Sequence, residues 1–139
     1  MAEWAIPLEA LPQALTGLQD IIARLKVRAH FPVEVRFTAG DDALLSPAHG
    51  RVTAWVGIIA YRPYGVGDQQ HLPYFAEFDS LMVGLQGRPH WAKVLSPGVS
   101  SAHLAALYPE PAWRAFAELR AQWDPAGIFL NPWATRTLL

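Results

Sequence analysis

The chain has 139 residues, of which 52% are hydrophobic and 17% are charged, and its formal net charge is −1. This length fits one domain, and the high hydrophobic content excludes intrinsic disorder, which requires low hydrophobicity and high charge. The small net charge argues against nucleic acid as the main partner, and the lack of cysteine excludes disulfides, zinc–cysteine sites and iron–sulfur clusters.

The first half of the chain predicts a strand, a helix and two further strands. Residues 4–6 predict a short apolar strand, and Pro7 is placed to start a helix, where its missing N–H has no cost. Hydrophobic residues then recur at alternating steps of three and four, which predicts a helix over residues 8–26. Residues 31–38 alternate strictly, so that Glu34, Arg36 and Thr38 share one face of a strand. After a loop over residues 39–50, residues 51–61 are apolar on both faces, as in a central strand.

The second half predicts three helices and one more strand. Residues 62–73 form a connector rich in proline and glycine, and the hydrophobic spacing from Phe75 to Leu85 predicts a helix that ends at Gly87. Residues 88–95 are expected to form a strand. Ser100 or Ser101 can cap a short helix that runs to about residue 107.

Another helix is predicted to open at Pro111, and the tail from residue 124 begins with an Asp-Pro turn and continues as irregular chain. The order of the elements predicts an α+β fold, in which a mixed or antiparallel sheet has helices packed on one face. The sequence contains no internal repeat, so residues 1–139 are expected to form a single domain.

Glu34 and Arg36 are the first candidate site residues. Two positions apart on a strand, they point the same way with Cα atoms about 7 Å apart. A carboxylate beside a guanidinium could hold a polyol or a lactone through several hydrogen bonds. The alternative is a solvated outer face that carries a weak surface ion pair.

The segment RPHWAK (88–93) is the second candidate. On a strand, Trp91 and Lys93 would share one face and His90 would oppose them. A lysine beside an aromatic ring could stabilise an anion or a developing negative charge; alternatively, its chain extends along an edge strand toward solvent. The other histidines are scattered, without a pair at metal-ligand spacing, so no metal site is predicted.

Four stretches together resemble the C-terminal part of the sugar-1,4-lactone oxidases and alditol oxidases, which belong to the vanillyl-alcohol-oxidase superfamily of FAD enzymes. They are EWAIPLEALPQAL (3–15), FPVEVRFTAGDDALLSPAHGR (31–51), GRPHWAK (87–93) and WDPAGIFLNPW (123–133). A fifth stretch, WVGIIAYRPYG (55–65), resembles the gulonolactone and arabinonolactone branch. GRPHWAK followed downstream by DPAGIFLNP is the most specific part of the resemblance.

The resemblance implies the substrate domain of a flavoprotein oxidoreductase. In the family, an N-terminal domain binds FAD and the C-terminal domain covers the flavin ring. A hydride passes from a carbinol carbon to flavin N5, with O2 as the expected acceptor. The family pattern implies that Glu34 and Arg36 contact substrate hydroxyls, with Arg36 also at the flavin edge. It places His90 and Lys93 beside the flavin ring, where Lys93 would orient the substrate or support proton removal. Lys93, Glu34 and Arg36 are thus the expected catalytic residues.

The sequence departs from the family in two respects. No stretch matches the FAD-binding domain, so the expected partner is an FAD-binding domain or chain, without which this chain is expected to be inactive. Alditol oxidases carry a His and a Thr where this chain has Gly57 and Ile59. As substrate-binding positions, Gly57 and Ile59 favour a lactone similar to D-arabinono-1,4-lactone over an alditol, or they indicate lost activity.

Two further alternatives concern function and location. A non-catalytic module that binds a partner through its aromatic surface, or a truncated remnant, is the alternative to an enzyme domain. The N-terminus lacks the basic region of a secretory signal, and no apolar run approaches the roughly 18 residues that span a bilayer, so the expected location is cytoplasmic. Peripheral membrane attachment through Trp4, Trp113 and Trp133 is an alternative that the charge pattern does not support.

Overall fold

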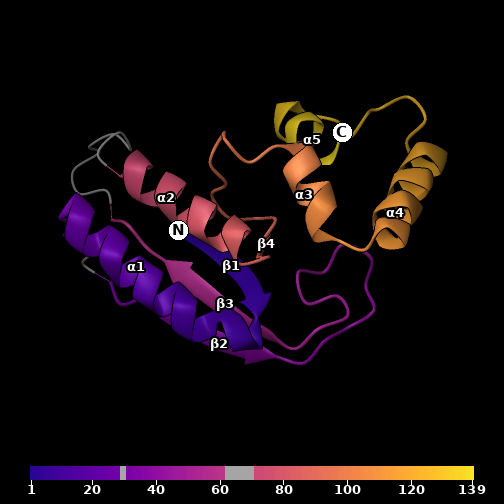
Figure 1. The fold of residues 1–139 in the computed structure, drawn as a ribbon. Coiled ribbons are helices and arrows are strands. Elements are labelled where there is room, and N and C mark those ends of the chain that lie inside the picture. The colour runs from indigo at the N-terminus through magenta and orange to yellow at the C-terminus, as the bar shows by residue number, and fades with distance from the viewer. Residues whose placement is uncertain (29–30, 62–70) are drawn as a thin grey trace.

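A computed structural model, which describes residues 1–28, 31–61 and 71–139, contains one antiparallel sheet of four strands in the order β2-β3-β1-β4 (Figure 1). The strands are β1 (Ala2–Pro7), β2 (Glu34–Thr38), β3 (Thr53–Ile58) and β4 (Arg88–Pro89). The predicted α+β class is therefore confirmed, and β3 lies inside the sheet as its apolar sequence predicted. Most of the predicted connector, with the glycines at 65 and 67, lies outside the described residues.

Helices surround the sheet unevenly. They are α1 (Leu11–Leu25), which follows a 3-10 turn η1 (Leu8–Ala10), α2 (Leu72–Gly84), α3 (Ser101–Leu107), α4 (Glu110–Trp123) and α5 (Pro132–Leu138). The helices α1 and α2 contact each other and lie side by side along the sheet, whereas α3, α4 and α5 gather beyond its end (Figure 1).

One face of the sheet packs against α1 and α2 to form the core. Trp4, Ile6 and Val56 project from the strands into the same buried cluster as Leu18 of α1 and Phe78 of α2. All five side chains are at most 1% exposed. Burial of one such side chain stabilises the fold by about 1.5–3 kcal/mol, so this face supplies most of the hydrophobic stabilisation of the sheet.

The opposite face of the sheet, here termed the polar face, carries different chemistry. Residues that pair directly across an antiparallel ladder project to the same side. The pairs Arg36–Trp55, Trp55–Ala5 and Ala5–Arg88 therefore place these side chains on one face, together with Glu34 opposite Gly57. None of these residues belongs to the core cluster. The helices α1 and α2 thus cover one face, as predicted. On the polar face Ala5 and Arg88 are buried, whereas the side formed by β2 and β3, with exposed Arg36 and half-buried Trp55, is accessible for a site.

The prediction of a strand over residues 88–95 is wrong in the length of that strand. Only Arg88 and Pro89 pair with β1, and the chain then turns at His90–Lys93, where the Lys93 amide donates to the His90 carbonyl at 3.0 Å. Trp91 leaves the sheet because its ring stacks on Tyr108 and its indole N–H donates to the Leu45 carbonyl at 2.7 Å. His90 and Lys93 are therefore arranged by a turn and not by strand alternation.

Other element boundaries also differ from the sequence prediction. The left-handed residue after α2 is Gln86, with φ 56°, and not Gly87. The strand β2 begins at Glu34 and not at residue 31. The tail predicted to be irregular contains α5, whose N-terminus is capped by Asn131 through a 2.9 Å bond to the Ala134 amide. Asn-Pro at this position is a helix-start signal that the sequence prediction passed over.

Among the described residues, no helix combines the length and the hydrophobicity that crossing a bilayer requires.

Candidate functional site

Glu34 and Arg36 form an ion pair at the outer edge of the polar face. A guanidinium nitrogen of Arg36 lies 2.9 Å from Oε2 of Glu34, and their side chains are 63% and 36% exposed. An exposed pair of this kind contributes little to stability, so its positions are free to serve a ligand. Strand alternation brings the two side chains together, as predicted.

Trp55 connects this pair to the segment that follows β4. It lies directly opposite Arg36 in the β2–β3 ladder, and its indole N–H donates to Thr38 Oγ1 at 2.9 Å. Its ring meets the His90 ring in an edge-on arrangement, with centroids 6.1 Å apart and planes at 66°. The structure thereby brings Glu34, Arg36 and His90 to one side of the sheet, with the indole between them.

The turn at residues 90–93 carries both His90 and Lys93, and only the backbone of Lys93 is bonded to His90. The His90 amide donates to the Glu3 carbonyl of β1 at 2.9 Å, and the Ala92 amide donates to Nδ1 of the His90 ring at 3.1 Å. Within the described residues, the ammonium group of half-buried Lys93 has no hydrogen bond or ion pair. The amine is therefore free to meet a ligand.

The two predicted specificity positions have different surroundings. Gly57 is buried opposite Glu34, and a Cβ at this position would come within 3.3 Å of the Met1 methyl group and 3.7 Å of the Glu34 Cβ. A side chain at position 57 would therefore press on the Met1 methyl group and make ordinary van der Waals contact with the Cβ of Glu34. Ile59 lies one residue beyond the end of β3 and is half-buried, so the ladder does not place it with the others.

Two arginines, Arg88 and Arg51, hold the backbone near this turn. Arg88 is 6% exposed; its guanidinium donates to the carbonyls of Leu107 and His49, each at 2.7 Å, and stacks over the Tyr108 ring at 4.7 Å. Burial, reinforced by the charge of Arg88, lowers the pKa of Arg51 to about 10. Arg51 donates to the carbonyls of Gln86 and Ala5. Both arginines therefore bond to backbone carbonyl oxygens and stabilise the chain on both sides of β4.

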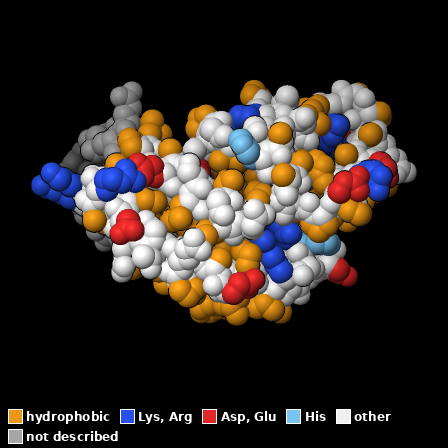
Figure 2. Space-filling view, in the orientation of Figure 1, with side chains coloured by type: hydrophobic (Ala, Val, Ile, Leu, Met, Phe, Trp, Pro, Cys, Tyr) orange, Lys and Arg blue, Asp and Glu red, His pale blue; other side chains and the backbone are white. Residues whose placement is uncertain are grey.

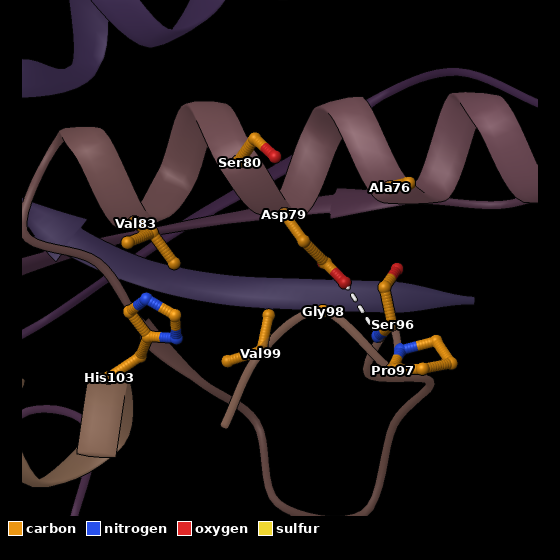
Figure 3. A pocket seen from close by; sticks show the side chains of 9 residues that line it. All are labelled: Ala76, Asp79, Ser80, Val83, Ser96, Pro97, Gly98, Val99 and His103. Carbon is orange, nitrogen blue, oxygen red and sulfur yellow. Dashed lines mark hydrogen bonds between the residues drawn. The ribbon is translucent and has the colours of Figure 1, made fainter. Parts of the chain in front are cut away.

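The cavity in Figure 3 is a separate feature on the helical side of the molecule. It has a volume of about 330 Å³ and lies between α2 and the segment that leads into α3. Its carboxylate, Asp79, already accepts hydrogen bonds from the Trp4 indole and the Ser96 amide, both at 2.7 Å. His103, on the opposite wall, bonds Ser100 in a capping box. These polar groups stabilise the fold, so the polar face is the stronger candidate site.

The polar face combines the groups that recognise a hydroxylated ligand. A carboxylate accepts hydrogen bonds from hydroxyls, a guanidinium and an amine donate to oxygen atoms, and an indole ring packs against an apolar ring face. Among the described residues, no three His, Asp or Glu side chains gather so that they could hold a metal ion.

Trp55 is the member of this constellation that the sequence did not single out. The signal was its position: it precedes Gly57 by two residues, and alternation places both on one face. What the sequence lacks is the strand pairing that sets Trp55 opposite Arg36 and beneath His90.

Comparisons with known proteins show what the chain is similar to. The family model of D-arabinono-1,4-lactone oxidase matches residues 1–137. An L-gulonolactone oxidase of Mus musculus is 44% identical over 130 residues, which are 93% of this chain and 28% of that protein. An L-gulono-1,4-lactone dehydrogenase of Mycobacterium tuberculosis is 36% identical over 136 residues, or 98% of this chain and 30% of that protein.

An alditol oxidase of a Streptomyces species is 36% identical over 135 residues, which are 94% of this chain and 29% of that protein. The chain therefore spans less than a third of the length of each of these relatives.

Proposed function

This chain belongs to the D-arabinono-1,4-lactone oxidase family, which is a family of oxidoreductases, and on that basis we propose that it forms the substrate side of an FAD-dependent enzyme that oxidises a sugar 1,4-lactone. The observation that carries the proposal is the polar face, where the Glu34–Arg36 pair, the Trp55 ring and His90 lie together. As a single substrate domain, residues 1–139 would close over a flavin that other polypeptide binds.

The polar face suits one edge of a flavin. Arg36, His90 and Lys93 offer N–H groups to the oxygen and nitrogen acceptors of a planar polar ring, whereas the sequence has no glycine-rich turn opening a helix to hold the phosphates. His90, Lys93 and Arg36 would therefore meet the ring edge, and an FAD-binding domain or chain would hold the rest. The flavin, when bound, supplies the hydride acceptor.

The residues of this chain orient the substrate. Glu34 accepts hydrogen bonds from sugar hydroxyls, and Arg36, fixed by its ion pair with Glu34, donates to a ring or carbonyl oxygen. The amine of Lys93 lies on the same turn as His90 and stabilises charge that develops on the substrate oxygen as its proton leaves. Gly57, which pairs with Glu34 in the β2–β3 ladder, is proposed to lie beside the bound lactone ring.

The electron acceptor is proposed to be O2. The matched relatives carry the names of both an oxidase and a dehydrogenase. An assay therefore needs both O2 consumption and reduction of a dye, and the first is expected to respond.

We infer that the FAD-binding partner contacts an exposed apolar surface beside α4 and α5. Trp123, Ile128 and Phe129 are 78%, 79% and 81% exposed, and Trp123 and Phe129 line an apolar groove of about 390 Å³. Hydrophobic side chains also gather around α4 on the visible face of the molecule (Figure 2). Asp124 holds this segment in place by accepting bonds from the amides of Ile128 and Phe129. Exposed apolar patches of this kind mark protein contacts.

The test is reconstitution. The 139-residue chain is mixed with an FAD-loaded flavin domain from a family member, and lactone-dependent O2 uptake is recorded with D-arabinono-1,4-lactone, L-gulono-1,4-lactone and xylitol. We expect uptake with the lactones and a loss of at least about 100-fold in Lys93→Ala, which removes a group that acts on the reacting oxygen.

Arg114→Ala is the matched control, because Arg114 is an exposed cation on α4 that pairs with Glu110 on the same helix. A stable complex without turnover would favour a non-catalytic partner-binding module. Equal turnover of wild type and Lys93→Ala would contradict the role of Lys93.

A further inference from the structure

We propose that His90 is held as its Nε2–H tautomer by the Ala92 amide and the Trp55 ring, and that it serves the site as a hydrogen-bond donor and not as a proton acceptor. The role in catalysis rests on the proposed function, whereas the tautomer is a property of this chain alone.

The hydrogen bond from Ala92 fixes which ring nitrogen carries the proton. A neutral imidazole has one N–H and one bare nitrogen, and only the bare nitrogen accepts a hydrogen bond. A backbone amide can only donate, and the Ala92 amide lies 3.1 Å from Nδ1 of His90. Nδ1 is therefore bare in the neutral ring, and the proton is on Nε2.

The turn holds this amide in place from both sides. The His90 amide donates to Glu3 of β1 at 2.9 Å, and the His90 carbonyl accepts from the Lys93 amide at 3.0 Å. With the backbone of residues 90–93 fixed at these points, the Ala92 amide points to the ring without any rearrangement.

Trp55 fixes the direction in which the ring points. Its indole is anchored on β2 through Thr38 Oγ1 at 2.9 Å, and its ring meets His90 with centroids 6.1 Å apart. Such edge-on aromatic pairs contribute attraction beyond the area that they bury. Because Trp55 also lies opposite Arg36, it sets the His90 ring relative to the Glu34–Arg36 pair, and it acts as a positioning residue.

The chemical consequence is a division of roles. The Nε2–H group is directed to an oxygen or nitrogen acceptor, which is either a substrate oxygen or the polar edge of the flavin. Neither nitrogen of this tautomer is a free base, because Nδ1 is occupied by Ala92 and Nε2 carries its proton. Within the turn, Lys93 is then the group that stabilises the negative charge formed when the substrate loses its proton.

The tautomer is read directly by two-bond 1H–15N correlation NMR of the 139-residue chain, with the His90 signals assigned from a His90→Gln spectrum. We expect a bare Nδ1 and a protonated Nε2. His49 is an internal control of opposite sign, because its Nδ1 lies 2.8 Å from the Ala43 carbonyl, which can only accept. His49 should therefore show a protonated Nδ1. An Nδ1–H form of His90, or an even mixture of tautomers, would overturn the proposal.

The role of Trp55 is tested by two variants. In Trp55→Leu we expect the two His90 nitrogen signals to move toward a tautomeric average, whereas Trp55→Phe, which keeps a ring, should restore the wild-type pattern. Trp55 lies outside the core cluster, so both variants should fold, which the melting temperature checks. An unchanged His90 pattern in a folded Trp55→Leu protein would remove Trp55 from the proposal.

The donor role is tested in the reconstituted enzyme. Gln carries an amide N–H close to the position of Nε2, so His90→Gln should keep turnover within about tenfold, whereas His90→Leu should lose about 100-fold or more, as for removal of one positioned donor. If both variants lose activity equally, His90 does not act as a donor. If the wild-type complex shows no turnover, the proposed function fails while the NMR result still decides the tautomer.

Discussion

Trp4 and Asp79, which are 75 positions apart in the sequence, are joined by a buried hydrogen bond in which the indole N–H donates to a carboxylate oxygen at 2.7 Å. The second carboxylate oxygen accepts from the Ser96 amide at 2.7 Å. Asp79 of α2 thereby bonds both to β1 and to the segment that precedes α3. The positions of the sheet and of α3 therefore depend on the same carboxylate.

Replacing Trp4 with Phe should destabilise the fold while keeping an aromatic ring in the core. The change removes one donor from a buried carboxylate, which costs about 2 kcal/mol. Urea unfolding monitored by circular dichroism measures the free energy of unfolding. Trp123→Phe is the control, because Trp123 is 78% exposed, and its stability should match wild type. Equal stability of Trp4→Phe and wild type would show that the bond to Asp79 contributes nothing.

Stability should depend on pH through Asp79. Burial raises its pKa, against hydrogen bonds from Ser96 and Trp4 that lower it. An acid whose pKa is raised by folding holds its proton more tightly in the folded state, so its stabilising contribution is complete below the unfolded pKa of about 4 and is lost as pH rises through the folded pKa.

Asp79→Asn removes this titration. The free energy of unfolding of wild type minus that of Asp79→Asn should therefore fall as the pH rises above about 4, as measured by urea unfolding at several pH values. A difference that grows over this interval would mean that folding lowers the pKa of Asp79.

Arg88→Lys should be strongly destabilising despite the conserved charge. An ammonium group cannot reproduce the separate bonds to the Leu107 and His49 carbonyls or the stacking on Tyr108. Loss of one buried, charge-assisted bond costs about 2–3 kcal/mol, visible as a lower urea midpoint. Arg114→Lys on the exposed face of α4 should leave the midpoint unchanged. If the two variants unfold alike, the carbonyl bonds of Arg88 are not needed.

Gly87→Ala should destabilise the fold because of the close approach of α2 to β4. A Cβ at this position would lie 2.7 Å from the Met82 carbonyl oxygen and 3.1 Å from Ile6 Cγ2, and backbone cannot yield as a flexible side chain does. Such overpacking typically costs about 1–3 kcal/mol, measured by thermal and urea unfolding. Gly98→Ala, with open space around its Cβ, is the matched control. Unchanged stability in Gly87→Ala would mean that α2 shifts freely.

Phe129→Ser should weaken the complex with the FAD-binding partner. Phe129 is 81% exposed beside the apolar groove, so its loss removes contact area without disturbing the core. Titration calorimetry with the flavin domain should give at least a tenfold higher Kd. Leu72→Ser, an exposed apolar position at the start of α2, should leave the Kd unchanged. Equal affinity of both variants would place the interface elsewhere.

The elements that follow local periodicity could be predicted from the sequence. The alternation of residues 34–38 gave the Glu34–Arg36 pair, because neighbouring positions on a strand need no tertiary information to share a face. The cap at Ser100 was also predictable, since a serine side chain bonds the amide three positions on.

The parts that depend on long-range contacts could not be predicted. The strand after Gly87 stops at Pro89 because Trp91 stacks on Tyr108, a partner that strand periodicity does not reveal. Trp55 became a site residue only through pairing with Arg36 and contact with His90. The placement of Lys93 followed from the same turn and not from a strand.

The core residues packed under α1 and α2 determine the stability of the sheet, whereas the proposed ligand contacts at Arg36 and Trp55 lie outside that core. Exchanging the side chains at exposed Arg36 and half-buried Trp55 changes this surface while the Trp4–Phe78 packing stays intact. Under the proposed function, new substrates can therefore be reached by changes at these accessible positions, and a library randomised there should remain largely folded.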